Sequence, residues 1–253
     1  MKTPKSILIT GASGGIGAAL AMLYANPGVS LALCGQNQER LEQVAQTCRA
    51  LRAVVTTRVL DVSDPFMTRE WISQCDNQHP LDLVIANAGV SYGFSPDENL
   101  ASHMLETFAV NVGGVFNTVH PAIELMQARG RGQIAVMSSL AGFHGLPSSP
   151  AYSTSKATVK AYGEALRGLY RSEGIEVSVI CPGFVETAMT AGNNFKMPFL
   201  MSAERAALII RRGLEANKAR IAFPWPMLAG IKLLQILPES LMSRLLTLAP
   251  AKN

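Results

Sequence analysis

The chain has 253 residues, of which 48% are hydrophobic and 16% charged, and this suits one large α/β domain with an extensive core. It contains no apolar run long enough for an ordinary transmembrane helix and no signal-peptide pattern at its N-terminus. The four scattered cysteines form no Cys-x-x-Cys pair, so we expect a reducing, cytoplasmic location and no metal site. The net charge of +4 is uneven, because residues 204–253 carry eight lysines and arginines against three acids. This basic fifth is either a solvated helix face or a contact with an acidic surface.

Short apolar runs alternate with helix-like segments in chain order. The runs suit buried parallel strands and cover residues 6–10, 29–34, 54–60, 81–86, 133–137 and 175–180. Helical segments follow at about residues 18–24, 38–50, 64–78 and 98–128, and a further helix carries Tyr152 and runs to about residue 173. Residues 219–224 fit a seventh strand at an edge. The alternation predicts one doubly wound α/β domain, with a parallel sheet between two layers of helices.

A glycine-rich stretch directly follows the first strand. Its glycines allow a sharp turn and let a pyrophosphate approach the backbone, and the helix that follows offers free N–H groups and the positive end of its dipole. A strand, a glycine cluster and a helix in this order indicate a dinucleotide-binding site. We expect it to include Gly11, Ser13, Gly14, Gly15, Ile16 and Gly17.

The second strand ends at Gly35-Gln36, where a dinucleotide fold reads the adenosine ribose. An acid there would bind the 2′-hydroxyl of NAD, whereas an arginine would hold the 2′-phosphate of NADP. The chain has neither at this point, and Arg40 comes one helical turn later. The missing acid favours NADP(H) over NAD(H), which stays an alternative; the candidate phosphate ligands are Ser13, Gln36, Asn37 and Arg40.

Tyr152 and Lys156 are four residues apart at the start of a predicted helix, so their side chains share one face. A neighbouring ammonium lowers the pKa of a phenol, and this prepares a tyrosine for general acid/base work. The spacing alone also fits a surface tyrosine and lysine on an ordinary helix. The stronger signal is positional, because ligands of a parallel sheet bind at the carboxyl ends of its strands. Polar or glycine residues recur there, at Gly11, Gly35, Asp61, Asn87, Ser139 and Pro182.

With these motifs the chain resembles the short-chain dehydrogenase/reductase family, in its single-domain branch, over residues 5–190 and more weakly to about 223. The run from Thr10 to Gly17 is similar to the family's cofactor glycine motif. Asp61-Val62 resembles the adenine-contacting pair, and Asn87-Ala88-Gly89 the motif that supports the sheet beside the cofactor. Pro182-Gly183 and Thr187 resemble the segment that holds the nicotinamide carboxamide. The resemblance implies a Rossmann-type sheet of about seven strands in the order 3-2-1-4-5-6-7.

Four further residues match the family's catalytic tetrad: Asn111, Ser139, Tyr152 and Lys156. The resemblance implies that Tyr152 is the acid/base, that Lys156 lowers its pKa and holds the nicotinamide ribose, and that Ser139 stabilises the substrate oxygen. It implies that Asn111 holds a water in a proton relay with Lys156. In purely structural terms, Ser139 would cap a strand end and Asn111 would bond helix backbone.

Residues 188–201 are expected to form a lid over the active site, because they follow the nicotinamide segment and mix apolar with small polar residues. We expect the substrate pocket to be apolar, unless these side chains simply pack the domain. Its candidate lining is Val90, Tyr92, Phe94, Phe143, His144, Leu146, Met189, Phe195, Met197, Phe199, Leu200 and Met201. His144 is interpreted as part of the pocket wall.

The tail divides the chain into a catalytic domain over residues 1–223, with a cofactor half to about 130, and an apolar extension over 224–253. Two short helices separated by Pro238 fit the extension. Three uses stay open: packing on the same domain or over the lid, burial against a second subunit, and contact of residues 224–248 with the inner face of a membrane.

The leading hypothesis is an NAD(P)-dependent oxidoreductase that reduces a carbonyl or oxidises a secondary alcohol on a medium-sized apolar substrate. Two alternatives are a cofactor-binding sensor with little turnover, and a sugar-nucleotide epimerase or reductase, for which 253 residues leave little room. The resemblance implies a homodimer or homotetramer through the helices that carry Asn111 and Tyr152. The basic tail has no recognisable nucleic-acid module.

Overall fold

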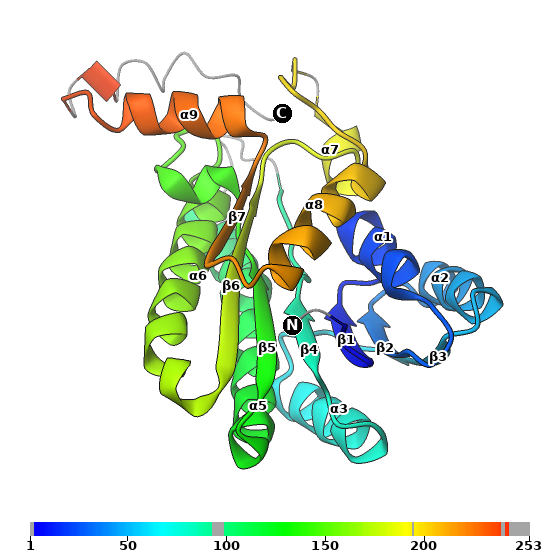
Figure 1. Ribbon diagram of the computed structural model, residues 1–253. Coiled ribbons are helices and arrows are strands. Elements are labelled where there is room, and N and C mark those ends of the chain that lie inside the picture. The colour runs from blue at the N-terminus through cyan, green and yellow to red at the C-terminus, as the bar shows by residue number, and fades with distance from the viewer. Residues whose placement is uncertain (1–2, 93–98, 194, 239–240, 243–253) are drawn as a thin grey trace.

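Seven parallel strands form one sheet in the order β3-β2-β1-β4-β5-β6-β7 in the computed structural model, which describes residues 3–92, 99–193, 195–238 and 241–242 (Figure 1). The order confirms the prediction. The strands are β1 (Ser6–Thr10), β2 (Ser30–Gly35), β3 (Val54–Val59), β4 (Leu83–Ala86), β5 (Gly132–Met137), β6 (Ile175–Pro182) and β7 (Arg220–Phe223). Strands β2 and β3 are added on one side of β1, and β4 to β7 on the other side, so the order of addition reverses between β1 and β4. Ligands of such folds bind outside the carboxyl ends of the strands at this point.

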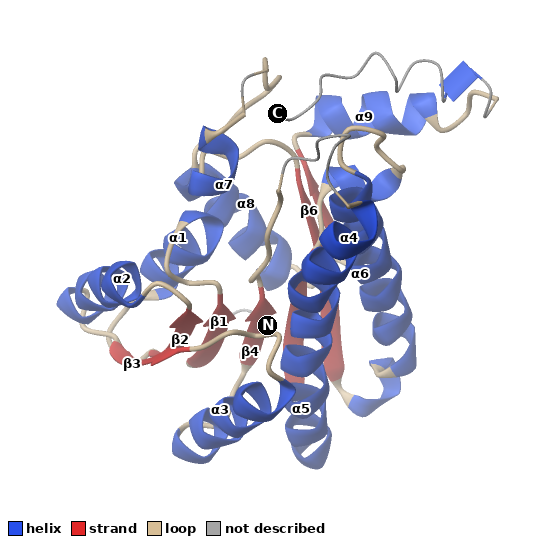
Figure 2. Ribbon diagram, turned by 180° about the vertical axis from the view of Figure 1, so that it is seen from behind, coloured by secondary structure: helices blue, strands red, loops and turns tan. Residues whose placement is uncertain are grey.

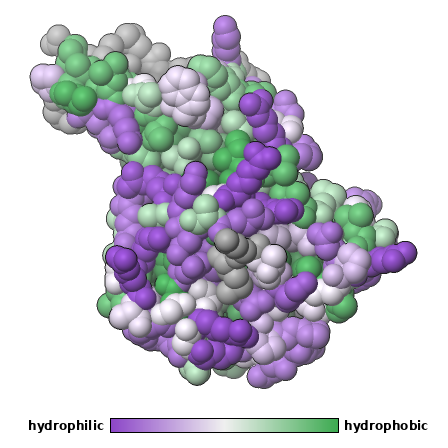
Figure 3. Space-filling model, in the orientation of Figure 1, coloured by the Kyte–Doolittle hydropathy of each residue, from purple (hydrophilic) through white to green (hydrophobic). Residues whose placement is uncertain are grey.

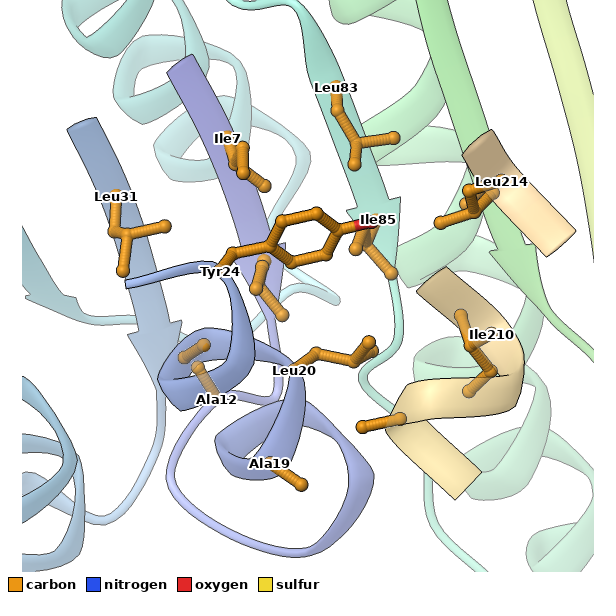
Figure 4. Packing of buried hydrophobic residues seen from close by; sticks show 14 of the residues in the cluster. Ile7, Ala12, Ala19, Leu20, Tyr24, Leu31, Leu83, Ile85, Ile210 and Leu214 are labelled. Atoms are coloured by element: carbon orange, nitrogen blue, oxygen red, sulfur yellow. The ribbon is translucent and has the colours of Figure 1, made fainter. Parts of the chain in front are cut away.

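Helices cover both faces of the sheet (Figure 2). Alternate residues of β1 point to opposite faces, so Ile7 and Ile9 enter one buried cluster and Leu8 enters the other. The first cluster lies under α1 (Gly15–Tyr24), α2 (Gln38–Ala50) and α8 (Ala203–Glu215). Figure 4 shows Leu20 and Tyr24 of α1 facing Ile210 and Leu214 of α8 over β1, β2 and β4.

The second face carries α3 (Pro65–Gln78), α4 (Leu100–Phe108), α5 (Gly114–Arg129) and α6 (Pro150–Leu169). The region expected as one helix over 98–128 is divided, since a π-helical turn at Ala109–Gly113 joins α4 to α5. The helix of Tyr152 ends at Leu169, earlier than expected, and a 3-10 turn, Arg171–Glu173, leads to β6. Helix α8 was not predicted, although Ser202 caps it and its apolar residues recur at helical spacing.

The last described elements stand at the carboxyl ends of the strands. A short helix, α7 (Ala188–Ala191), follows β6, and α9 (Trp225–Leu234) follows β7. Met227, Leu228 and Ile231 of α9 pack against the second buried cluster. The second helix expected after Pro238 lies largely outside the described residues, as does Phe94. Within the described chain, no helix combines the length and the apolar character that crossing a membrane requires.

Candidate active site

The glycine loop between β1 and α1 is held against the end of β4 by Asn87. The Asn87 Nδ2 atom donates hydrogen bonds to the carbonyl oxygens of Thr10 and Gly11, at 2.9 and 3.2 Å. Thr10 Oγ1 accepts from the backbone N–H groups of Asn87 and Ala88, both at 3.0 Å. Gly11 has a φ of +65°, and a Cβ there would lie 2.8 Å from the Ala88 Cα. The turn therefore needs glycine at this position.

The loop leaves room where a dinucleotide needs it. A Cβ on Gly14 would meet no atom within 4 Å, whereas one on Gly17 would lie 2.4 Å from the Gly11 carbonyl oxygen. No side chain of the described residues caps the N-terminus of α1, so the dipole end and first-turn N–H groups face the loop. An open concave loop before an uncapped helix fits a pyrophosphate, and the residues present therefore fit the dinucleotide that the sequence predicts.

Neighbouring strand ends carry the remaining residues that were expected on the adenosine side. Asp61 follows β3, is exposed, and accepts hydrogen bonds from the N–H and Oγ of Ser63, while Val62 is buried against Gly114. At the end of β2, a Cβ on Gly35 would lie 2.9 Å from Ser13 Oγ, so the glycine lets the first loop approach. Gln36 and Arg40 are both exposed.

Asn37 caps α2, and its Oδ1 accepts from the Arg40 N–H at 2.9 Å. This bond occupies an Asn37 acceptor that was expected to face the cofactor, and it fixes the start of α2. Glu39, in the first turn of α2, is the nearest acid in sequence after the strand end. The helix N-terminus itself carries a positive dipole end.

Ser139 lies directly after β5 and is 8% exposed. Its Oγ accepts from the Ala141 N–H at 3.1 Å and contacts the Pro182 carbonyl oxygen at 3.4 Å. The neighbouring Ser138 is buried and donates to the Lys156 carbonyl at 2.7 Å, which attaches α6 to the end of β5. A Cβ on Gly142 would lie 2.7 Å from the same carbonyl, so the turn after Ser139 packs directly on the α6 backbone.

Lys156 is 3% exposed, and its Nζ donates to the Met137 carbonyl oxygen at 3.0 Å. The same Nζ lies 5.8 Å from the centre of the Tyr152 ring. Burial lowers the pKa of Lys156 to about 8. The pKa of Tyr152 is raised, because burial outweighs the opposing effect of a hydrogen bond with Ser139. The expected lowering of the Tyr152 pKa is therefore wrong for this structure, since desolvation is the larger effect.

Asn111 lies in the π-helical turn and is fully buried. Its Oδ1 accepts from the Val90 N–H at 2.7 Å, and its Nδ2 donates to the Val90 carbonyl and to Ser155 Oγ at 2.9 and 3.0 Å. The side chain thus joins the segment after β4 to α6. A Cβ on Gly89 would lie 3.0 Å from Asn111 Oδ1 and 3.1 Å from Lys156 Nζ, so both groups border the same glycine.

The segment after β6 meets both the glycine loop and the tail. A Cβ on Gly15 would lie 2.9 Å from the Thr187 side chain, so Thr187 is close to the pyrophosphate loop. Gly183 donates its N–H to Phe223 at 2.7 Å, and a Cβ there would lie 3.0 Å from the Met227 sulfur. The segment expected to hold the nicotinamide is therefore in contact with the start of α9.

A cavity of about 340 Å³ opens beside Tyr152 and Ser139. Its walls come from the turn after β5, from the segment around α7, and from α9, and most of the lining is apolar. The Gln235 Nε2 atom donates to the Phe143 carbonyl at 2.7 Å and so ties the end of α9 to the turn after Ser139. The cavity lies within the size range of small-molecule sites.

Comparison with known proteins decides the family. The family model described as short chain dehydrogenase matches residues 5–197, about three quarters of the chain. An uncharacterized oxidoreductase of Myxococcus xanthus is 35% identical over 238 residues, which cover 94% of both chains. The chain belongs to the short-chain dehydrogenase family. It is an NAD(P)-dependent oxidoreductase by that membership.

Two solved structures show the same fold. A short-chain dehydrogenase/reductase from Burkholderia phymatum in complex with NAD has a TM-score of 0.85 at 24% identity, and the match covers 93% of this chain and 95% of that one. A 3-ketoacyl-ACP reductase from Sinorhizobium meliloti 1021 has a TM-score of 0.75 at 27% identity, over 86% and 96% of the two chains. The first of these likenesses supports the fold alone.

The predicted lid of this dehydrogenase is only partly a pocket wall. Met189 and Phe195 line the cavity, and so do His144 and Leu146. Met201 is instead a core residue, 8% exposed and bridged to Val185, because the chain must turn back into the domain to begin α8. The other apolar residues proposed for the pocket do not line this cavity, namely Val90, Tyr92, Phe143, Met197, Phe199 and Leu200.

Sequence reasoning did not name the other lining residues of the dehydrogenase as pocket residues, namely Ser91, Leu140, Ala141, Ser148, Ser149, Phe184, Thr190, Asn193, Met227, Ile231, Leu234, Gln235 and Met242. The α9 members repeat at helical spacing, but every residue of this segment except Lys232 lacks charge, so no polar face indicated which side was buried. Of the uses left open for the tail, packing on the same domain is seen for α9, because Met227 and Ile231 contact the second buried cluster and line the cavity.

Proposed function

We propose that this oxidoreductase reduces a carbonyl group, or oxidises the corresponding secondary alcohol, on a medium-sized apolar substrate. The observation that carries the proposal is the joint lining of one apolar cavity by Tyr152 and Ser139, with Lys156 buried behind them. A ketone fits such a site because it offers one oxygen to the two hydroxyl groups and an apolar body to the walls. The Sinorhizobium protein with the same fold is a 3-ketoacyl-ACP reductase, and reduction of a ketone by that protein supports this class.

Each tetrad residue has a role that its surroundings permit. Tyr152 gives a proton to the substrate oxygen during reduction, and Ser139 donates a hydrogen bond to the same oxygen as charge develops there. Lys156 contributes a positive charge near the Tyr152 ring, since its Nζ lies 5.8 Å from the ring centre. The nicotinamide cofactor, when bound, supplies or accepts the hydride. The Asn111 side chain keeps Val90 and Ser155 in position. A water that relays protons past Asn111 would bind either the remaining lone pair of its Oδ1 atom or its backbone.

In its resting state the site is ready to donate a proton. The raised pKa of Tyr152 keeps its phenol protonated at neutral pH, so the residue begins as a proton donor. Oxidation needs the phenolate, which forms more readily as pH rises. The reduction rate should therefore be highest at neutral pH and fall as pH passes about 8, where Lys156 loses its charge.

We further propose NADP(H) as the preferred cofactor. No carboxylate stands at Gly35, Gln36 or Asn37, and Arg40 is an exposed cation in the first turn of α2. The N-terminus of α2 adds a positive dipole end. Titration of NADPH and NADH against the protein should show tighter NADPH binding. Arg40→Ala should weaken NADPH binding about tenfold and leave NADH binding nearly unchanged. Arg171 is an exposed arginine after α6, and Arg171→Ala should change the binding of neither cofactor. Equal losses of NADPH and NADH binding in Arg40→Ala would exclude a role for Arg40 in phosphate recognition.

The decisive test of the reaction uses Tyr152→Phe. NADPH consumption is followed with ketones, aldehydes, steroids and acyl-chain carbonyls. The variant should lose at least about a thousandfold in kcat while its cofactor affinity changes little, because the ring stays and only the acid is removed. If Tyr152→Phe retained most of its turnover with the best substrate, the proposed proton transfer would be wrong.

We propose a homodimer in a reducing compartment as the working state. The four cysteines are all free thiols, which suits such a compartment. Leu105 of α4 and Leu169 of α6 are 74% and 64% exposed, and such large apolar side chains suit an interface between copies through these helices. Sedimentation equilibrium measures the assembly, and a monomer throughout would contradict this proposal.

A further inference from the structure

Helix α9 presents two apolar faces, and only one of them is covered. Met227, Ile231 and Leu234 line the cavity on the inner side. On the outer side, Trp225, Leu233 and Ile236 are 77%, 68% and 80% exposed. Trp225 and Leu233 share one face of α9 with Ala229 and Lys232, at spacings of four, seven and eight residues from Trp225, and Ile236 follows in the turn after the helix. We call this set, Trp225, Ala229, Lys232, Leu233 and Ile236, the outer stripe.

The outer stripe is unusual for a surface in water. Large exposed apolar side chains that lie together on a surface indicate an interaction site, whereas single scattered ones are normal on a protein surface. Figure 3 shows apolar side chains gathered at the upper left, where Figure 1 places α9 at the edge of the molecule. Among the described residues, α9 packs on the second buried cluster through Met227, Leu228 and Ile231, whereas Trp225, Leu233 and Ile236 stay exposed and are available to a partner.

The charge pattern indicates the kind of partner. The sequence contains no Asp or Glu between Glu215 and Glu239, and the single charged residue of α9 is Lys232, which lies in the outer stripe. A stripe with a cation, a tryptophan and aliphatic side chains matches an anionic lipid surface, where the aliphatic groups enter the acyl boundary and the cation meets the headgroups. A contact of the stripe with its copy would bury Lys232 without a carboxylate partner, which is costly.

The outer stripe lies close to the substrate cavity, so a membrane contact there would affect access of the substrate. The inner side of the same helix forms a wall of the cavity beside Tyr152, and a compound that fills an apolar cavity partitions into lipid. We propose that the outer stripe of α9 docks this dehydrogenase on an anionic membrane surface, from which the site collects its apolar substrate. The substrate part of this inference rests on the proposed function, whereas the docking part does not.

The test measures binding of the full chain to vesicles, without any turnover. The protein is floated with vesicles of phosphatidylcholine alone and with vesicles that also contain phosphatidylglycerol. We expect co-flotation with the anionic vesicles. Leu233→Glu combined with Ile236→Glu should reduce partitioning at least tenfold, because two aliphatic anchors are replaced by like charges. Lys232→Gln should reduce binding to anionic vesicles about fivefold and leave binding to neutral vesicles unchanged.

Phe66→Glu is the matched control, since Phe66 is 80% exposed at the start of α3, on the side of the molecule away from α9 (Figure 1). It introduces one glutamate, against two in the pair variant, at an equally exposed apolar residue and should not alter flotation. Fluorescence gives a second readout, because Trp71 is only 5% exposed and Trp225 is 77% exposed. Anionic vesicles should shift the emission to the blue in the natural chain and not in Trp225→Phe.

Three outcomes would overturn the proposal. The first is absence of co-flotation with anionic vesicles. The second is an equal loss with Phe66→Glu, which would indicate general repulsion. The third is a fall in sedimentation mass caused by the Leu233→Glu, Ile236→Glu pair without vesicles, which would assign the stripe to a contact between copies. Turnover of a small water-soluble ketone separates this test from the proposed function. The pair variant should turn over this ketone at the same rate as the natural chain. If the natural chain bound vesicles but did not turn over the ketone, the proposed reaction would be wrong and the docking proposal would stand.

Discussion

The charged side chain of Lys156 is almost completely buried. Among the described residues its ammonium donates a hydrogen bond to the Met137 carbonyl, and burial lowers its pKa from 10.5 to about 8. A charged group that is buried with so few partners destabilises the folded state, and the cost persists only because the residue has a use. The same burial raises the pKa of Tyr152, so desolvation acts on both members of the pair and favours the neutral form of each.

The pH dependence of stability follows from the Lys156 shift. Below pH 8 the lysine is protonated in both states and the burial penalty is fully present. Between pH 8 and 10.5 the unfolded chain binds the proton and the folded chain does not, so stability rises with pH. A shift of about 2.5 pKa units corresponds to about 3 kcal/mol in total.

We therefore predict that Lys156→Met is more stable than the natural chain at pH 7, and that this advantage shrinks by about 2 kcal/mol by pH 9.5. The lost bond to Met137 is the same at both pH values, so it does not affect the change. Urea unfolding of the two cofactor-free proteins at both pH values measures it. An advantage that stays constant with pH would mean that Lys156 keeps its charge when buried.

At the scale of elements, the active site is a meeting of segments from distant parts of the chain. The strands could be predicted from their apolar runs, and the ends of parallel strands are where polar residues acquire functions. The π-helical turn could not, because the bonds of Asn111 to Val90 and Ser155 are tertiary contacts with no signature in local sequence. Helix α8 could have been found from Ser202 and the spacing of Ala206, Ile210 and Leu214.

Helix α9 has a predictable effect on substrate size. Ile231 lines the cavity from the inner side of the helix, whereas Leu233, two residues later, is on the outer stripe. Ile231→Ala removes a piece of the wall and leaves space for further substrate methylenes, each of which adds about 0.8 kcal/mol when buried. The ratio of kcat/KM for a longer ketone to that for a shorter one should rise about fourfold.

Leu233→Ala provides the comparison for this prediction, because it shortens an exposed side chain of the same helix. It should leave the chain-length profile unchanged. The profile is measured with a series of ketones that differ by one methylene. Equal shifts in the two variants, or none in either, would mean that α9 does not limit the substrate.

For the molecule as a whole, the alternating apolar runs predicted a parallel sheet with polar or glycine residues at its strand ends, and the family resemblance supplied the strand order. It did not predict how much of the substrate site comes from the last segment of the chain. The apolar character of that segment is visible in the sequence, but its buried side is decided by contacts with Gly183 and Phe143. The cofactor side of the site is thus encoded locally, while the substrate side depends on tertiary packing.

This division leads to a prediction for a chain that ends after Pro224. Its sheet would be complete, since β7 ends at Phe223, and the glycine loop would keep its bonds to Asn87. The shortened chain should fold, with a Tm lower by about 5–10 °C because Met227, Leu228 and Ile231 no longer cover the second buried cluster.

The shortened chain should bind the cofactor within about threefold of the full chain. Turnover of a bulky apolar ketone should fall at least tenfold, whereas that of a small ketone should fall much less, since only the bulky one needs the α9 wall. Circular dichroism, cofactor titration and NADPH absorbance measure the three quantities, and a shortened chain that fails to bind the cofactor would show that the extension also supports the cofactor half.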